Sequence, residues 1–282
     1  MSINILLKVN VFKEVFMTGL AYPEISPIFL KIGFLSVRWY SLAYLFGIIA
    51  AWILIYRNIQ KYKLPIKRTQ LDDLIFNITI GIVLGGRIFY VLFYNIDMFL
   101  SNPLEIFALW HGGMSFHGGL LGAITGLYYS ARKIKYPFLG LTDMAALYTP
   151  IGLFFGRLAN FINDELWGRP TDVPWAVRFP NGGYIPRHPS QLYEAALEGV
   201  VLFCLLQILW RFEWVRAKKG FVSGVFLTFY ALVRISIEFF REPDVQLGFF
   251  FEYVTMGQML SMPLLLVGIW LIYFSSNQKL RS

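Results

Sequence analysis

Residues Met256–Phe274 read MGQMLSMPLLLVGIWLIYF, a run without a charged side chain. An α-helix rises about 1.5 Å per residue, so ~20 mostly apolar residues cross the hydrocarbon layer of a membrane. The run is therefore predicted to be a transmembrane helix that ends close to the C-terminus.

Six further apolar stretches precede this one in the chain. Together the seven predicted spans occupy residues 39–56, 71–94, 114–131, 141–161, 190–210, 221–239 and 256–274. Hydrophobic residues make up 57% of the chain and charged residues 15%, whereas a soluble globule carries about a quarter charged residues. We predict an all-α polytopic membrane protein of about seven transmembrane helices, with residues 1–282 as a single membrane domain.

Lysine and arginine are unevenly divided between the links that join these spans. Residues 57–70, 132–140, 211–220 and the C-terminal tail hold 14 of them, and the opposite side holds 8. Cytoplasmic links carry the excess of basic residues in membrane proteins, so the C-terminus is predicted in the cytoplasm and the N-terminus outside. The net charge of +8 thus indicates topology and not nucleic-acid binding. Residues 1–16 are too interrupted for a cleavable signal peptide, and Met17 is a hypothetical alternative start.

With this orientation, polar side chains gather in the outer halves of five predicted spans. They are Tyr40, Arg87, His117, Arg157, Asn160, Tyr230, Arg234 and Glu238. A charge at the centre of a spanning helix costs about 2.5–3.5 kcal/mol on insertion scales. Several such groups at one depth are explained most simply by one shared, hydrated pocket beneath the outer surface.

Each of these residues also has a structural interpretation. Arg234 and Glu238 are four residues apart and can neutralise each other on one helix face. Arg157 can extend to the interface without a partner, and Arg87 can hold helices together. Further structural interpretations are an aromatic-belt position for Tyr40, a structural role for His117, a helix N-cap for Asp143, and packing for the lone Cys204.

Glycines recur at a spacing of four residues in three predicted spans. They are Gly81 and Gly85; Gly118, Gly122 and Gly126; and Gly152 and Gly156. This spacing predicts close helix packing, with room for a lipid chain between helices as the alternative. The three histidines are widely spaced and the single cysteine lies in an apolar run, so we predict no metal site.

Four motifs resemble those of prolipoprotein diacylglyceryl transferases. They are GRLANFINDELWGR at residues 156–169, GGMSFHGG at 112–119, RHPSQLYE at 187–194 and IEFFREPD at 237–244, with LGGRI at 84–88 and Trp39–Tyr40 as further support. The resemblance runs from about Ile25 to the C-terminus. Residues 1–16 have no counterpart, Ala159 replaces a common glycine, and His111 stands where relatives carry an acid.

The resemblance implies an enzyme of the bacterial cytoplasmic (inner) membrane. Such enzymes move the diacylglyceryl group of phosphatidylglycerol to the thiol of the lipobox cysteine in a preprolipoprotein signal peptide, and they release glycerol phosphate. It also implies a periplasmic head segment at about residues 163–189. No cofactor, metal or nucleic acid is expected, and the oligomeric state is left open.

Residue by residue, the resemblance and the chemistry together define an expected site. We expect catalytic roles for His117, Arg157, Arg234, Tyr40 and Asn160, and substrate-binding roles for Arg157, Arg234, Glu238, Tyr230, Glu165, Gly168 and Arg87. Guanidinium groups bind phosphate through paired hydrogen bonds. His117 is expected either to act as the general base for the thiol or to position substrate. Glu165 is expected either to act directly or to brace the head.

Two other classes of protein compete with an enzyme. A transporter needs a polar path through the membrane and often inverted repeats, but the cytoplasmic halves of the predicted spans are almost purely apolar. A structural scaffold gives no reason for several costly intramembrane arginines. The sequence therefore favours the enzyme.

Overall fold

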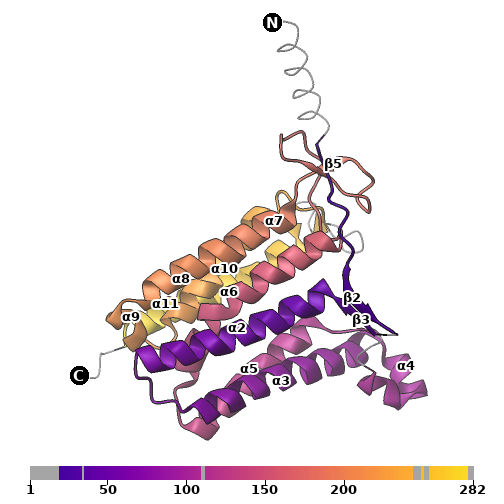
Figure 1. Cartoon of the computed structure of the whole chain (residues 1–282). Coiled ribbons are helices and arrows are strands. Elements are labelled where there is room, and N and C mark those ends of the chain that lie inside the picture. Colours follow the sequence, from indigo (N-terminus) through magenta and orange to yellow (C-terminus); the bar gives the residue numbers. More distant parts are fainter. Residues whose placement is uncertain (1–18, 34, 109–111, 244–248, 251–253, 279–282) are drawn as a thin grey trace, which may run out of the picture. The chain divides into compact units, whose positions relative to one another are not determined.

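The computed structural model describes residues 19–33, 35–108, 112–243, 249–250 and 254–278 (Figure 1). The alternative start at Met17 and His111 lie outside these ranges. The chain divides into two compact units, one of Met1–Ala50 with Ala146–Ser282 and one of Ala51–Ala145. Two helices, α2 (Trp39–Lys61) and α6 (Phe138–Ile162), contribute residues to both units.

Helices dominate the first unit. Besides its parts of α2 and α6, it contains α7 (Ser190–Glu194), η3 (Ala195–Val201), α8 (Leu202–Trp210), α9 (Glu213–Ala217), α10 (Phe221–Ile237) and α11 (Met256–Ser276). The elements α7, η3 and α8 continue one another as a single helix, Ser190–Trp210. Helices α10 and α11 meet at glycines, since a Cβ at Gly224 would lie 2.9 Å from the Gly268 carbonyl oxygen. Leu202, Leu206 and Val222 are fully buried in this unit.

Short strands also belong to this unit. Strand β4 (Val177–Arg178) pairs parallel with β1 (Leu20–Ala21) and antiparallel with β5 (Pro186–Arg187). Strands β2 (Ile28–Ile32) and β3 (Leu35–Arg38) form an antiparallel hairpin directly before α2, and β6 (Phe249–Phe250) pairs with β7 (Val254–Thr255) directly before α11.

The second unit is built on the pair of helices α3 (Arg68–Tyr94) and α5 (Phe116–Ile134). Helix α4 (Ile96–Ser101) and the 3-10 turn η1 (Pro103–Phe107) lie between them in the chain. A Cβ at Gly81 would overlap the Gly122 carbonyl, and a Cβ at Gly85 would overlap that of Gly118. The predicted close packing is therefore confirmed for this pair of helices.

The glycines of α6 do not follow the same pattern. A Cβ at either Gly152 or Gly156 would meet nothing within 4 Å. Close packing was thus wrongly predicted for Gly156. Gly152 does have a close neighbour, because a Cβ at Gly47 would lie 3.2 Å from the Gly152 Cα. Asp143 was also misplaced, because α6 begins at Phe138 and Asp143 is buried inside it instead of capping it.

Helices occupy all seven predicted positions in the described part of the chain. Five are long and apolar enough to cross a membrane: α2, α3, α6, Ser190–Trp210 and α11. Helix α10 has 17 residues, and the glycine-rich α5 is less apolar. The all-α polytopic class is confirmed, whereas the count of seven spans and the single domain remain predictions.

Candidate functional site

Two glutamates on the helix Ser190–Trp210 form the centre of the polar site. Glu194 ends α7, and Glu198 lies within η3, a π-helical segment. Both are fully buried. Sequence reasoning missed them as site residues. The sequence does carry a signal for them, because two acids four residues apart in an apolar run share one helix face and are energetically costly in a membrane.

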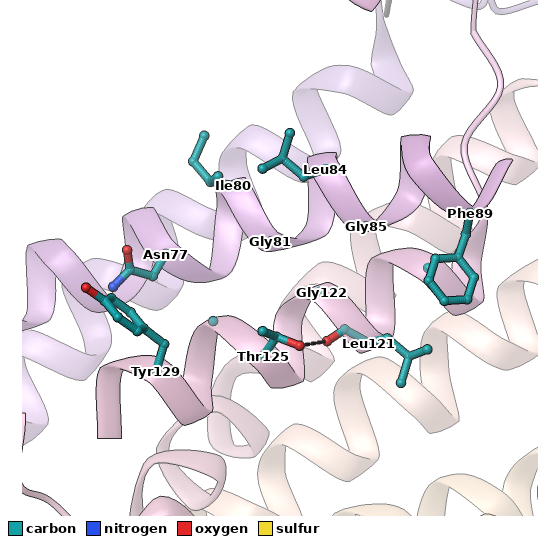
Figure 2. A pocket seen from close by; sticks show the side chains of 12 residues that line it. Asn77, Ile80, Gly81, Leu84, Gly85, Phe89, Leu121, Gly122, Thr125 and Tyr129 are labelled. Carbon is teal, nitrogen blue, oxygen red and sulfur yellow. Dashed lines mark hydrogen bonds between the residues drawn. The ribbon is translucent and has the colours of Figure 1, made fainter. Parts of the chain in front are cut away.

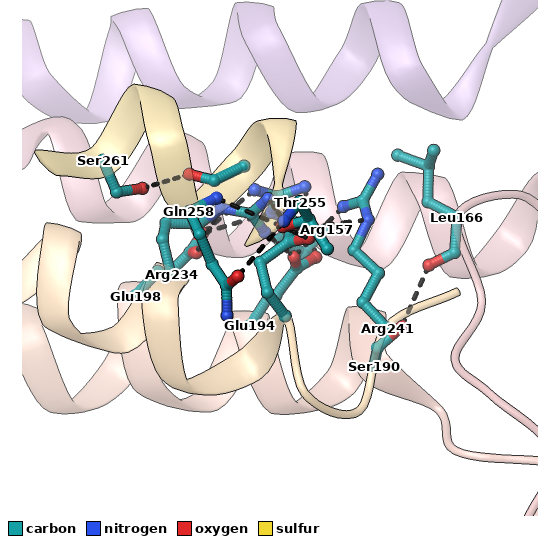
Figure 3. A network of polar contacts seen from close by, with 12 residues as sticks. Arg157, Leu166, Ser190, Glu194, Glu198, Arg234, Arg241, Thr255, Gln258 and Ser261 are labelled. Carbon is teal, nitrogen blue, oxygen red and sulfur yellow. Dashed lines mark hydrogen bonds and ion pairs between the residues drawn. The ribbon is translucent and has the colours of Figure 1, made fainter. Parts of the chain in front are cut away.

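Arg157 of α6 binds both of these glutamates. Its Nε and Nη2 donate to Glu198 Oε2 at 3.2 and 3.1 Å, and its Nη1 lies 3.1 Å from Glu194 Oε2 (Figure 3). The Arg157 side chain is 16% exposed. Arg157 is therefore held in a fixed direction and does not extend alone to the interface.

Arg234 of α10 reaches the same carboxylates from another helix. Its Nη1 donates to Glu194 Oε1, and its Nη2 donates to Glu238 Oε1 at 2.6 Å. Its Nε lies 3.9 Å from Glu198 Oε1. The predicted Arg234–Glu238 pair is thus present, but it is part of a larger network.

A third arginine, Arg241, completes the cluster. Its Nη1 donates to Glu194 Oε1 at 3.3 Å, and its Nε lies 4.0 Å from Glu238 Oε1. The Thr255 hydroxyl, which caps α11, donates to Glu238 Oε2 at 2.7 Å. A Cβ at Gly257 would collide with the Glu238 carboxylate. Arg241, Thr255 and Gly257 were not predicted as site residues.

The described arginines and glutamates of this network balance in charge, three against three. Burying ions is expensive unless each is paired and hydrogen-bonded, and sharing carboxylates between arginines meets that condition. Two atoms depart from it, because Glu194 Oε2 and Glu198 Oε1 are buried without a hydrogen-bond partner among the described residues and have only ion-pair contacts, to Arg157 Nη1 at 3.1 Å and to Arg234 Nε at 3.9 Å. No group of three or more His, Cys, Asp or Glu in the described ranges is suited to hold a metal ion.

Asn160 and Glu165 form a second contact beside the arginines. Asn160 lies about one turn beyond Arg157 on α6, and its amide donates to Glu165 Oε1 at 2.7 Å. Asn163 donates to the same oxygen at 3.2 Å, and Gln191 donates to the Glu165 carbonyl at 2.7 Å. Glu165 is nevertheless exposed, so its carboxylate is both braced and accessible.

Two predicted tyrosines lie in the same unit as these groups. The Tyr40 hydroxyl is 3.3 Å from that of Tyr44 and is close enough to Arg157 and Glu165 to interact with their charges. The Tyr230 hydroxyl interacts electrostatically with Arg157 in the same way. Both tyrosines are thus within electrostatic reach of the arginine–glutamate network.

Gly168 joins the head segment to the chain at Arg241. Its N–H donates to the His188 carbonyl at 2.8 Å, and it bridges to Arg241. A Cβ at Gly168 would lie 2.6 Å from both the His188 and the Phe240 carbonyl oxygens. This arrangement leaves no room for a side chain at position 168, which explains the glycine. A contact of Gly168 with substrate remains a prediction.

Three titratable groups in or beside the head segment, the buried Asp164 and the half-buried Tyr22 and His188, have shifted pKa values. Asp164, with φ of 53°, accepts from the Asn181 N–H at 2.6 Å, and burial raises the pKa of its carboxyl. Burial and the nearby Asp164 raise the pKa of Tyr22, whose hydroxyl donates to the Phe161 carbonyl at 2.8 Å. Burial lowers the pKa of His188.

His117 and Arg87 belong to the second unit. His117 is exposed in the first turn of α5, with its ring edge against Phe116. Arg87 is buried and donates only to main-chain carbonyls among the described residues. These are the carbonyls of Glu105, Ile106, Ala108, Gly112 and Gly113. The contacts of Arg87 support the structural interpretation, and its substrate-binding role remains a prediction.

An open groove of about 390 Å³ runs along the contact of α3 and α5 (Figure 2). Gly81, Gly85 and Gly122 are among the residues that line it, and the Thr125 hydroxyl donates to the Leu121 carbonyl at 2.8 Å. The groove is therefore mainly apolar, and its use by a lipid chain remains a prediction.

The fold and site define a polytopic membrane protein with a buried arginine–glutamate cluster. The family model of prolipoprotein diacylglyceryl transferase matches residues 27–274. The chain belongs to this family.

Curated relatives agree over nearly the whole chain. A protein of Rhodospirillum rubrum is 54% identical over 263 residues, which cover 93% of this chain and 96% of the relative. A protein of Nitrobacter hamburgensis is 51% identical, over 90% and 89%. One of Vibrio cholerae is 50% identical, over 93% and 95%. Each is named phosphatidylglycerol–prolipoprotein diacylglyceryl transferase.

Proposed function

We propose that the protein transfers the diacylglyceryl group of phosphatidylglycerol to the thiol of a lipobox cysteine in preprolipoproteins, the first step of lipoprotein maturation. Family membership supports the reaction, and the names of the relatives supply both substrates. The structural observation that carries the proposal is the binding of Arg157 and Arg234 to one carboxylate, that of Glu194.

The reaction exchanges one bond of the lipid for another. The cysteine sulfur forms a bond to the glycerol carbon that carried the phosphate ester, and the carbon–oxygen bond breaks. The electron pair leaves with the oxygen as glycerol phosphate, and the thiol proton is lost. The site must therefore favour a thiolate and stabilise negative charge on the departing phosphate.

Arg157 and Arg234 are proposed to hold that phosphate. The contacts of Arg157 to described residues use at most three of the five N–H groups of a guanidinium, two in hydrogen bonds and one in an ion pair. The remaining donors are available to phosphate oxygens at the exposed edge of the side chain. Glu194, Glu198 and Glu238 orient the guanidinium groups beforehand, so little reorganisation is needed when the leaving group gains charge.

The remaining predicted residues take supporting roles in the proposal. Asn160 donates to the lipid head group or holds Glu165 beside it. Tyr40 and Tyr230 border the arginines and contact the glycerol portion of the lipid. His117 accepts the thiol proton or positions the peptide, whereas the arginines lower the pKa of the thiol by favouring its anion. Glu165 and Gly168 shape the binding site for the peptide beside the head segment.

The proposed location is the inner membrane of a bacterium. The excess of Lys and Arg in alternate links supports a cytoplasmic C-terminus and a periplasmic N-terminus. In this orientation the arginine–glutamate cluster and the head segment are on the periplasmic side. A lipobox peptide already anchored by its signal helix enters sideways from the bilayer, together with the lipid donor.

The test combines the purified protein with phosphatidylglycerol and a lipobox peptide. Mass spectrometry is expected to find one diacylglyceryl group on the cysteine, with release of glycerol phosphate. A peptide with serine in place of the cysteine should stay unmodified. Absence of the adduct with an intact cysteine peptide, in a preparation that binds the lipid, contradicts the proposed reaction.

A further inference from the structure

The hairpin of β2 and β3 has two faces of opposite character. Side chains directly opposite in an antiparallel pair share a face, and alternate residues along a strand share one too. Leu30 pairs with Val37, and Ile32 follows Leu30 by two residues, so these three form an apolar face. Lys31 pairs with Ser36 on the other face, and Arg38 follows Ser36 by two residues and pairs with Ile28 beyond an irregularity in the register.

The apolar face of this hairpin is largely uncovered, with Val37 half-buried. Every residue of β2 is exposed, with Leu30 at 47% and Ile32 at 61%. A two-stranded hairpin with no core is marginal in water. The exposed apolar face of so small an element therefore indicates that something outside this chain covers it.

The hairpin is also fixed to the first residue of a membrane-spanning helix. Trp39, which begins α2, donates its main-chain N–H to the Pro27 carbonyl at 3.2 Å and its ring N–H to the Ser26 carbonyl at 3.1 Å. The Phe29 and Trp39 rings meet edge to face at 4.7 Å. Because α2 is long and apolar enough to cross the membrane, its first residue and the attached hairpin lie at the boundary between lipid and water.

We propose that the β2–β3 hairpin is a lipid-binding surface that favours anionic head groups. Its apolar face, Leu30, Ile32 and Val37, rests on the acyl chains, and Lys31 and Arg38 extend to the phosphates. Basic side chains near the membrane surface attract anionic lipids, and their apolar stems follow the interface while the charges stay hydrated. This surface does not depend on the transfer reaction, although it would collect an anionic donor next to Tyr40.

Fluorescence quenching in the full-length membrane protein tests the proposal. The only native cysteine is removed as Cys204→Ser, and a label that senses its surroundings is attached through Ile32→Cys or, as the matched control on the opposite face, Ser36→Cys. The protein is placed in phosphatidylcholine vesicles that contain a fixed fraction of lipid with brominated acyl chains, either phosphatidylglycerol or phosphatidylcholine.

The label at Ile32 is expected to be quenched several-fold more than the label at Ser36. Brominated phosphatidylglycerol should quench it more than brominated phosphatidylcholine at the same fraction. The double variant Lys31→Gln/Arg38→Gln should remove the preference for phosphatidylglycerol but keep the stronger quenching at Ile32 than at Ser36. The control Lys61→Gln/Lys63→Gln, at the far end of α2, should keep both the preference and the stronger quenching at Ile32.

Equal quenching at Ile32 and Ser36 would overturn the proposal, as would the absence of a preference for phosphatidylglycerol. An Ile32 label that is shielded from brominated lipid and from aqueous iodide alike would show that protein covers this face, which also overturns it. Retained transferase activity of each labelled protein verifies folding and keeps this result separate from a failure of the proposed reaction.

Discussion

Arg157 and Arg234, from helices α6 and α10, bind the two different oxygens of the Glu194 carboxylate. Two guanidinium cations that repel each other are thereby held next to each other. Glu198 and Glu238 flank them, one on each arginine. The result is a pair of oriented cations whose unused donors can meet one anionic group.

Substitution Glu194→Gln should weaken the site more than any single peripheral change. It removes the charge that both arginines share, and breaking a buried ion pair costs about 3–5 kcal/mol. We expect a lower melting temperature and at least about a tenfold loss of transfer. Glu213→Gln, on the exposed face of α9, is the control and should change neither. A Glu194→Gln protein with normal stability and turnover contradicts the shared-carboxylate arrangement.

Substitution Glu198→Gln should separate binding from turnover. The neutral amide keeps the size of the side chain, but the network gains one net positive charge. The KM for phosphatidylglycerol should therefore fall, while kcat falls about tenfold because Arg157 is no longer held by a carboxylate. Steady-state kinetics at several lipid fractions measure both values. A parallel loss in both, together with a lower melting temperature, would indicate that Glu198 only stabilises the fold.

The pH dependence of transfer activity in His117→Gln distinguishes the two roles expected for His117. If it is the general base, His117→Gln should lose most transfer at neutral pH and recover at alkaline pH, where the thiol, with an ordinary pKa of about 8.5, ionises without help. Activity of wild type and variant is compared from neutral to alkaline pH with the same peptide. A constant ratio across that range would instead assign His117 to positioning.

His188 should make the head segment sensitive to acid. Burial lowers its pKa in the folded state from the ordinary value of about 6.5. Its contribution to stability is therefore complete above about pH 6.5 and is lost as the pH falls through the lowered pKa. Melting temperatures should decline from pH 7 to pH 5, and His188→Gln should flatten that decline. Burial raises the pKa of Asp164, so its contribution to stability changes with pH in the opposite direction to that of His188. Asp164 is present in the wild type and in His188→Gln, so the difference between their melting curves reports His188 alone.

Much of the fold followed from hydrophobicity alone. The seven apolar runs became helices because a spanning segment must satisfy its own backbone hydrogen bonds. The hairpin of β2 and β3 was not predicted, since its strands are short and depend on contacts with Ser26, Pro27 and Trp39. Main-chain geometry of this kind leaves little trace in residue type.

The site was predicted in part, for a physical reason. A cation in an apolar run is energetically costly, and Arg157 and Arg234 were predicted as site residues for this reason. Glu194 and Glu198 were not predicted, although two acids four residues apart in an apolar run carry the same energetic cost. Thr255 and Gly257 contribute only through tertiary contact with Glu238, and no local pattern marks them.

A double-mutant cycle on Arg157 and Arg234 tests most directly whether both hold one phosphate. Lysine keeps the charge but loses the planar fork. Each single change, Arg157→Lys and Arg234→Lys, should reduce kcat/KM for phosphatidylglycerol about 100-fold, as expected for the loss of charge-assisted hydrogen bonds worth roughly 1.5–3 kcal/mol each. The double variant should lose clearly less than the product of the two, because both residues act on one group. Near-normal turnover in either single variant, or strict additivity in the pair, would contradict a shared phosphate site.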